Sequence, residues 1–149
     1  MQARSVWHIA AALSGASGVG AAAYGAHGLP KLIAADEAAA LASAAKTGSA
    51  APADSGAAAV PPPRELASPE LREACFARAN SQHMYHSLLM AAAPVVARRP
   101  AVVGGLALAG TLSFCGSVYA VALSGERARG IAAPAGGFCL IGAWLALLL

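Results

Sequence analysis

Three long stretches of this sequence carry no charged side chain, and they constrain the fold more than any other feature. Residues 6–30, 100–125 and 130–149 contain no Asp, Glu, Lys or Arg. Each is long enough to cross about 30 Å of hydrocarbon as a helix, which rises about 1.5 Å per residue. A fourth uncharged stretch, residues 81–97, lies at the lower length limit of roughly 17 residues. The sequence therefore predicts an all-α fold, an integral membrane four-helix bundle.

The composition also favours lipid over water as the solvent. Only 11% of the residues are charged and 58% are hydrophobic, whereas soluble domains carry charge on about 25% of positions. We expect a single membrane domain over residues 1–149, with spans at about 5–27, 81–97, 101–123 and 131–149. Most basic side chains lie beside the predicted membrane boundaries, so membrane lipids are expected partners. No basic stripe with interleaved aromatic residues points to nucleic acid.

One segment differs from the rest in composition. Residues 31–69 are rich in Ala, Ser and Pro, contain no aromatic residue, and include the run Val60-Pro61-Pro62-Pro63. Such a segment has little apolar surface to bury. We predict a low-complexity extramembrane insert that forms a flexible, partly extended loop.

An interfacial amphipathic helix is predicted at residues 68–80, directly before the second span. Ser68 suits the N-cap and Pro69 the first helical position. Glu70 suits the positive end of the helix dipole. Arg72 and Arg78 are expected to be available to lipid head groups.

Small residues recur every four positions in the first and third predicted spans. This spacing puts them on one helical face, where another backbone can approach closely. An alternative is that Ala and Gly are simply common in this chain. The predicted helix-packing residues are Ser14, Gly18, Ala22, Gly105, Ala109, Ser113 and Ser117.

The histidines raise the question of a metal or haem site. His83 and His86 are three positions apart on one helical face, and His27 ends the first span. Such sites normally need more ligands, and no carboxylate or inner cysteine is placed to help. We therefore expect no metal and no cofactor. Instead, we expect His27, His83, His86 and Tyr85 to make polar contacts between the first and second spans, because polar groups in lipid need partners.

Four ordered patches of sequence carry a family resemblance. They are Ser14-Gly15 with Gly25-Ala26-His27-Gly28-Leu29, Ala79-Asn80 with His83 and His86-Ser87-Leu88, Phe114-Cys115-Gly116-Ser117 with Tyr119 and Ala122-Leu123-Ser124-Gly125, and Ala133-Pro134-Ala135-Gly136-Gly137 with Gly142 and Trp144-Leu145-Ala146-Leu147. Together they resemble the transmembrane protein 256 family, whose bacterial relatives form an inner-membrane domain of unknown function. The resemblance implies a small four-helix membrane protein without an established catalytic activity, and its eukaryotic members are associated with mitochondria. The sequence departs from the family at Gln82, where an aromatic residue is usual, and by the insert.

We expect this protein not to be an enzyme. The run Ser14-Gly15-Ala16-Ser17-Gly18 lies in an apolar helix with no base expected nearby, and Gly136-Gly137 lacks the Lys and the Ser or Thr of a phosphate loop. The leading hypothesis is a non-catalytic accessory subunit that packs against larger membrane-protein subunits. Its expected location is a respiratory complex of the mitochondrial inner membrane. The alternatives are a stand-alone protein that binds a lipid or small hydrophobic ligand, and a small carrier or channel.

Overall fold

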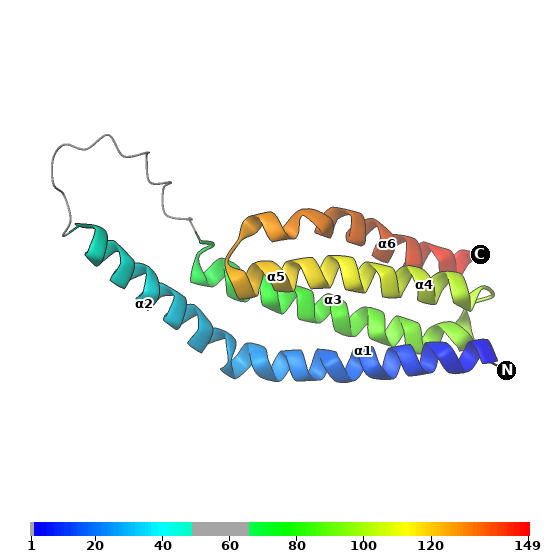
Figure 1. The fold of residues 1–149 in the computed structure, drawn as a ribbon. Helices are drawn as coiled ribbons and strands as arrows, with labels where there is room; N and C mark the ends of the chain where they lie inside the picture. Colours follow the sequence, from blue (N-terminus) through cyan, green and yellow to red (C-terminus); the bar gives the residue numbers. More distant parts are fainter. Residues whose placement is uncertain (1, 49–65) are drawn as a thin grey trace.

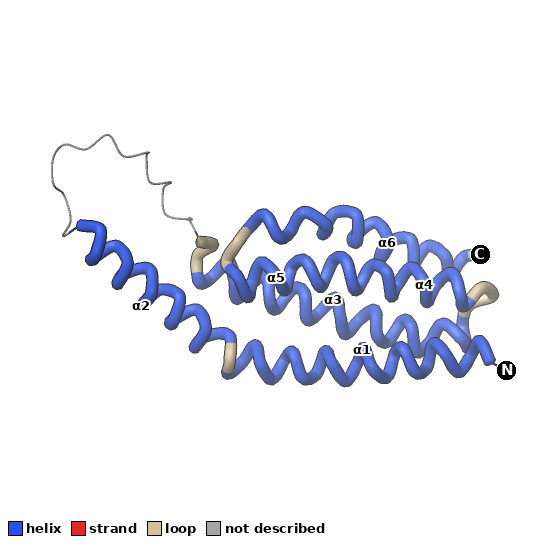
Figure 2. The backbone as a smooth tube through the Cα atoms, in the orientation of Figure 1, coloured by secondary structure: helices blue, strands red, loops and turns tan. Residues whose placement is uncertain are grey.

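A computed structural model describes residues 2–48 and 66–149, and this part of the chain is built from helices without a strand. The helices form an elongated bundle, from which one helix projects at an angle (Figures 1 and 2). The elements are α1 (Gln2–His27), α2 (Leu29–Gly48), α3 (Pro69–Val96), α4 (Pro100–Gly110), the π-helical turn η1 (Thr111–Cys115), α5 (Gly116–Ser124), the 3-10 helix η2 (Arg127–Ala132), α6 (Ala133–Leu145) and the 3-10 helix η3 (Ala146–Leu148). The all-α prediction is confirmed.

Three helical stretches are long and apolar enough to cross a membrane: Val6–His27, Pro100–Ser124 and Arg127–Leu148. This is the pattern of an integral membrane protein. The predicted spans at 5–27, 101–123 and 131–149 fall on these stretches. The predicted span at 81–97 falls on the second half of α3, which is more polar than the other three.

Helix α3 lies at the centre of the bundle. Helix α1 packs along it, α4 and α5 pack against another of its faces, and α6 packs on α4 and η1. Where α3, α4 and α6 meet, the fully buried side chains are mostly small or slender, namely Met90, Ala93, Val103, Ala107 and Ala143. Small side chains let helix backbones approach closely, which is how membrane helices gain packing energy without a hydrophobic effect between them.

The stretch Pro100–Ser124 is interrupted near its middle by the π-helical turn η1. Helix α6 packs against the stretch at this turn. A Cβ atom on Gly136 would collide with the backbone nitrogen of Phe114. π-helical turns are single wide turns that re-aim side chains, and this one is held against a glycine that leaves room for it.

The prediction of a loop at residues 31–69 is wrong for its first half, where α2 continues to Gly48. The remaining residues to 65, including the Pro-rich run, lie outside the described part. Alanine is the best helix former, and α2 is alanine-rich. Its first turns are also anchored, because Leu29 and Ile33 are buried against the bundle.

Arg72 is not available to lipid head groups as predicted; it is only 2% exposed. Its guanidinium donates hydrogen bonds of 2.8 Å to the backbone oxygens of Ala122 and Leu123, near the end of α5. It also pairs with Asp36 of α2 at 2.9 Å. These carbonyls are among the last of their helix and have no partner within it. Arg72 therefore caps α5 and ties α2 to the bundle, while Arg78 is exposed.

The predicted start of α3 is confirmed. The Ser68 hydroxyl accepts a hydrogen bond from the Leu71 N–H at 3.4 Å, and Pro69 is the first helical residue. Hydrogen bonds from its own backbone N–H and from Ser68 lower the pKa of the exposed Glu70 carboxyl. From this cap, α3 runs without a break through residues 68–80 and 81–96.

Candidate functional site

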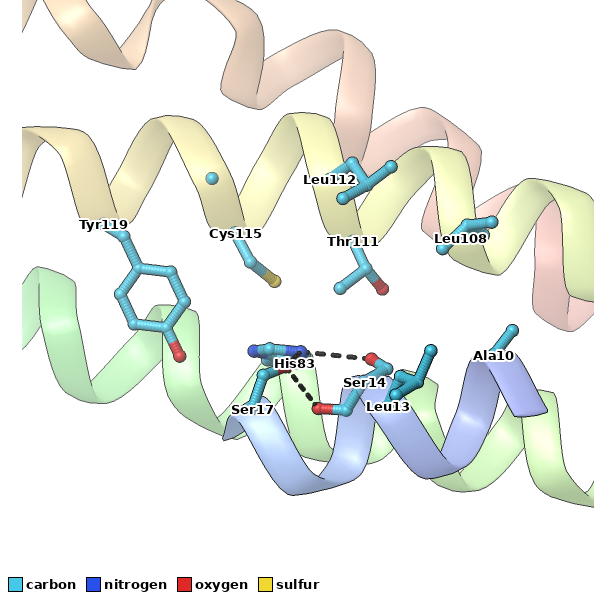
Figure 3. A pocket seen from close by; sticks show the side chains of 11 residues that line it. Ala10, Leu13, Ser14, Ser17, His83, Leu108, Thr111, Leu112, Cys115 and Tyr119 are labelled. Carbon is cyan, nitrogen blue, oxygen red and sulfur yellow. Dashed lines mark hydrogen bonds between the residues drawn. The ribbon is translucent and has the colours of Figure 1, made fainter. Parts of the chain in front are cut away.

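A groove of about 480 Å³ runs between α1 and the α4–η1–α5 stretch, with α3 behind it. Figure 3 shows its lining side chains. Leu13 and Leu112 at its rim are each 69% exposed, so the groove opens on the bundle surface. The lining residues are Ala10, Leu13, Ser14, Ser17, His83, Leu108, Thr111, Leu112, Cys115, Gly116 and Tyr119. This volume lies within the range of pockets that bind small molecules.

The turn η1 supplies one wall of the groove. Thr111 and Cys115, at its two ends, are both buried, and Tyr119 follows one helical turn later. Figure 3 shows Thr111, Cys115 and Tyr119 on the wall opposite Ser14 and Ser17. The Tyr119 hydroxyl donates to the side-chain oxygen of Asn80 at 3.0 Å, which fixes the ring at one end of the groove.

Serine hydroxyls on α1 and α3 determine how His83 is bonded. The Ser87 hydroxyl donates its proton to the backbone oxygen of His83 at 2.8 Å. In the 2.7 Å contact between Ser14 and Ser87, the donor must therefore be Ser14. Ser17 likewise donates to the backbone oxygen of Ser14 at 2.8 Å. Each serine has one proton to give, so none is left for His83.

With the serine protons given to these acceptors, His83 donates through Nε2. This nitrogen lies 3.1 Å from the Ser14 Oγ and 3.5 Å from the Ser17 Oγ, both of which can only accept. A neutral imidazole carries one proton, so Nδ1 is left with a lone pair. The prediction that no base lies near Ser14 and Ser17 is wrong in space. In this arrangement, however, the histidine gives a proton to the serines and does not withdraw one.

Two polar atoms in the groove wall have no hydrogen-bond partner within the described residues: Nδ1 of His83 and Oγ1 of Thr111. Both are buried, and both belong to residues that line the groove. A buried polar atom without a partner costs roughly 1–3 kcal/mol. The groove therefore contains unmet hydrogen-bonding capacity at its inner wall.

The four residues predicted to make polar contacts between the first and second spans differ in the helix that they contact and in their exposure. His83 links α3 to α1, as described, whereas His86 contacts α6. The Trp144 Nε1 donates to the His86 Nε2 at 3.2 Å, and the His86 Nδ1 donates to the backbone oxygen of Gln82 at 2.7 Å. His27 and Tyr85 are exposed, and neither makes an interhelical hydrogen bond to the described residues.

The predicted helix-packing residues of α1 lie along α3 to different depths. Ser14 is hydrogen-bonded to α3, and Gly18 is buried under Met84, whose side chain a Cβ there would strike. Ala22 is exposed but lines a second hollow beside Phe76.

The predicted packing residues of the stretch Pro100–Ser124 are less buried. Gly105 and Ser117 are half-buried and Ala109 is exposed. Ser113 lies beside Gly136 of α6. Among the glycines of this stretch, Gly104 next to the Trp7 ring and Gly110 next to Leu140 leave the least room for a side chain.

Thr111, Cys115 and Tyr119 were not predicted as a set from the sequence. The signal was present, because three polar or polarisable residues recur every four positions within a largely apolar stretch. Nothing in the sequence indicated that His83 would face them. In the described part of the chain, no three His, Cys, Asp or Glu side chains lie close enough to share a metal ion.

Comparison with known proteins identifies a family. The family described as "Protein of unknown function (DUF423)" matches residues 56–137, more than half of the chain. The match includes α3, the α4–η1–α5 stretch and Gly136, and thus two walls of the groove. The serines of α1 lie outside it. No solved structure matches the chain.

Proposed function

The chain belongs to the DUF423 family of proteins of unknown function, and we propose that it is a non-catalytic, four-span membrane protein that holds a small amphiphilic ligand in its groove. The observation that carries the proposal is the groove itself. Its rim is apolar, as a lipid-facing opening requires, and its inner wall holds the two unpartnered polar atoms of His83 and Thr111. Pockets for small molecules typically combine an apolar lining with a few polar groups that orient the ligand.

The path of the chain supports a fourth membrane crossing by α3. Helix α1 ends at one end of the bundle, and α4 begins at the other, next to the N-terminus (Figure 1). Helix α3 has 28 residues, enough to cross about 30 Å of hydrocarbon. Its polar His86 and Ser87 are buried against other helices, while Tyr85 and Leu88 face outward. This arrangement suits lipid around α3.

A photolabelling experiment tests the groove and the fourth span together. The full-length protein in phospholipid vesicles is exposed to an alkyl chain that carries a diazirine, and labelled residues are mapped by mass spectrometry. We expect saturable labelling of the groove and non-saturable labelling of outward residues, including Tyr85 and Leu88 of α3. A Cβ on Gly116 at the rim meets open space, so Gly116→Phe is expected to obstruct the groove and reduce its labelling several-fold.

The matched control is Gly20→Phe. Gly20 also has open space around it, but it is not one of the residues that line the groove. This variant should leave the groove labelling unchanged. Labelling spread evenly over the apolar surface, with no saturable component in the groove, would remove the proposal. An unlabelled outer face of α3 would remove the fourth span.

A second role is supported by the outer face of α1. Ala12, Ala16, Gly20 and Ala23 are exposed there at helical spacing, which suits close packing by a helix of another membrane protein. The assignment of that partner to a respiratory complex of the mitochondrial inner membrane rests on the family resemblance and stays a prediction.

The size of the native particle in mild detergent tests this accessory role. We expect the wild-type protein to migrate with a larger membrane-protein assembly. Gly20→Phe should shift it to a small particle, because the added ring separates the two helices. Migration of the wild-type protein alone, as a small species, contradicts the accessory role.

A further inference from the structure

We propose that the ligand of the groove is an uncharged amphiphile whose polar end is a hydroxyl group. This inference rests on the proposed function and specifies the chemistry of the ligand. It follows from which hydroxyl and imidazole protons of the groove residues already take part in hydrogen bonds. The two unpartnered atoms, Nδ1 of His83 and Oγ1 of Thr111, are not equivalent, and each requires a different hydrogen-bonding group on a ligand.

The first demand comes from His83. Because its Nε2 donates to Ser14 and Ser17, its Nδ1 can only accept. A ligand that completes this site must therefore bring a hydrogen-bond donor. Ketones, esters, ethers and quinones offer acceptors alone and leave Nδ1 unsatisfied. The histidine of the same helix that faces α6 has no such demand, because both nitrogens of His86 are already bonded.

The second demand comes from Thr111. Its hydroxyl is unpartnered and 5% exposed, and it can donate or accept. A hydroxyl on the ligand also does both, so one kind of group satisfies both atoms of the wall. Both atoms are covered by their neighbours. A ligand reaches them through small side-chain movements, such as rotation of Thr111 about χ1.

The depth of the site selects against a charged ligand. Thr111 is the twelfth residue of the 25-residue stretch Pro100–Ser124, and Ser17 is the twelfth of the 22 residues Val6–His27. Both lie at the middle of their stretches and hence near the middle of the bilayer. A charge costs several kcal/mol at this depth. No Asp, Glu, Lys or Arg lines the groove to offset such a charge. Fatty acids and zwitterionic head groups are therefore excluded in favour of an alcohol.

A matched pair of probes tests this inference. They are hexadecanol with a diazirine in its chain and the methyl ether of the same molecule, each titrated against the full-length protein in vesicles. We expect the alcohol to label the groove with half-saturation at about tenfold lower concentration than the ether, because the ether leaves Nδ1 without a donor. Thr111→Val, which keeps the shape and removes the hydroxyl, should weaken both probes several-fold, because Thr111 can donate to the oxygen of either one.

A double variant, Ser14→Ala with Ser17→Ala, probes the proton arrangement. Without these serines, His83 is free to carry its proton on Nδ1 and to donate to an ether oxygen. The ratio of the half-saturation concentrations of ether and alcohol should then fall toward one. General destabilisation of the fold does not produce this effect, because it weakens both probes. The thermal unfolding midpoint of each variant shows whether it is folded, and either variant suffices if the other does not fold.

The outcomes separate the two proposals. Equal labelling of the groove by alcohol and ether in the wild-type protein overturns the hydroxyl assignment and leaves groove binding intact, with water as the partner of the two atoms. Absence of saturable groove labelling by both probes removes the binding function itself. A preference for the alcohol that persists in the double variant removes the role of His83, and unchanged half-saturation for both probes in Thr111→Val removes the role of Thr111.

Discussion

Replacement of Arg72 by alanine is expected to lower the free energy of unfolding by about 3–5 kcal/mol, the range for removing one partner from a buried charged network. The guanidinium of Arg72 holds three groups: the backbone oxygens of Ala122 and Leu123, and the carboxylate of Asp36. Its removal leaves two carbonyls at the end of α5 and one carboxylate without their partner. The Asp36 side chain is 35% exposed, so solvent screens the ion pair, and the carbonyl bonds carry more of the effect.

The Arg72→Ala variant should also release α2 from the bundle. Titration with SDS in mixed micelles, followed by circular dichroism, measures the loss of stability. Faster trypsin cleavage after Lys31, in the first turn of α2, reports the release. Arg78→Ala is the matched control, because Arg78 lies on the same helix and is exposed. Equal stability of the two variants would contradict the structural role of Arg72.

Substitution of Gly136 by alanine is expected to destabilise the protein by about 1–3 kcal/mol, the cost of overpacking a well-packed contact. The added methyl group meets the backbone of η1 at Phe114 and the Ser113 hydroxyl. Backbone cannot rotate out of the way as a flexible side chain can. Helix α6 must therefore shift away from the α4–η1–α5 stretch.

The adjacent glycine provides the control for this prediction. A Cβ on Gly137 would lie 3.8 Å from the ring of Phe114, an ordinary contact. Gly137→Ala should therefore be neutral or stabilising by up to about 1 kcal/mol, because glycine is a poor helix residue. The same SDS titration compares the two variants. If both alanines have the same effect, Gly136 is not the point of closest approach.

Much of the helical layout could be predicted from local sequence. Long uncharged stretches predict helices in a lipid solvent, since the backbone must satisfy its own hydrogen bonds there. The start of α3 was also predictable, because Ser68 and Pro69 act on the backbone directly beside them. These features depend on residues close in sequence, and the structure agrees with them.

Helix α2 was missed because its composition is ambiguous. An Ala-rich segment with little apolar surface forms either a solvated loop or a helix, and local propensity contributes only tenths of a kcal/mol per residue. The helix is anchored through Leu29, Ile33 and the pair of Asp36 with Arg72. Arg72 was wrongly predicted to face lipid head groups because its partners lie 36, 50 and 51 positions away in sequence.

The sequence by itself determined that lipid surrounds the apolar helices and how far these helices extend, because both depend on hydropathy summed over consecutive residues. Only the tertiary structure decided the groove. It brings Ser14 and Ser17 of α1 to His83 of α3, and it turns Thr111 toward them through the wide turn η1. The proton that each serine gives elsewhere leaves His83 with an unfilled acceptor. Assigning the donors and acceptors around His83 requires the distances between helices, which no sequence pattern along a single helix provides.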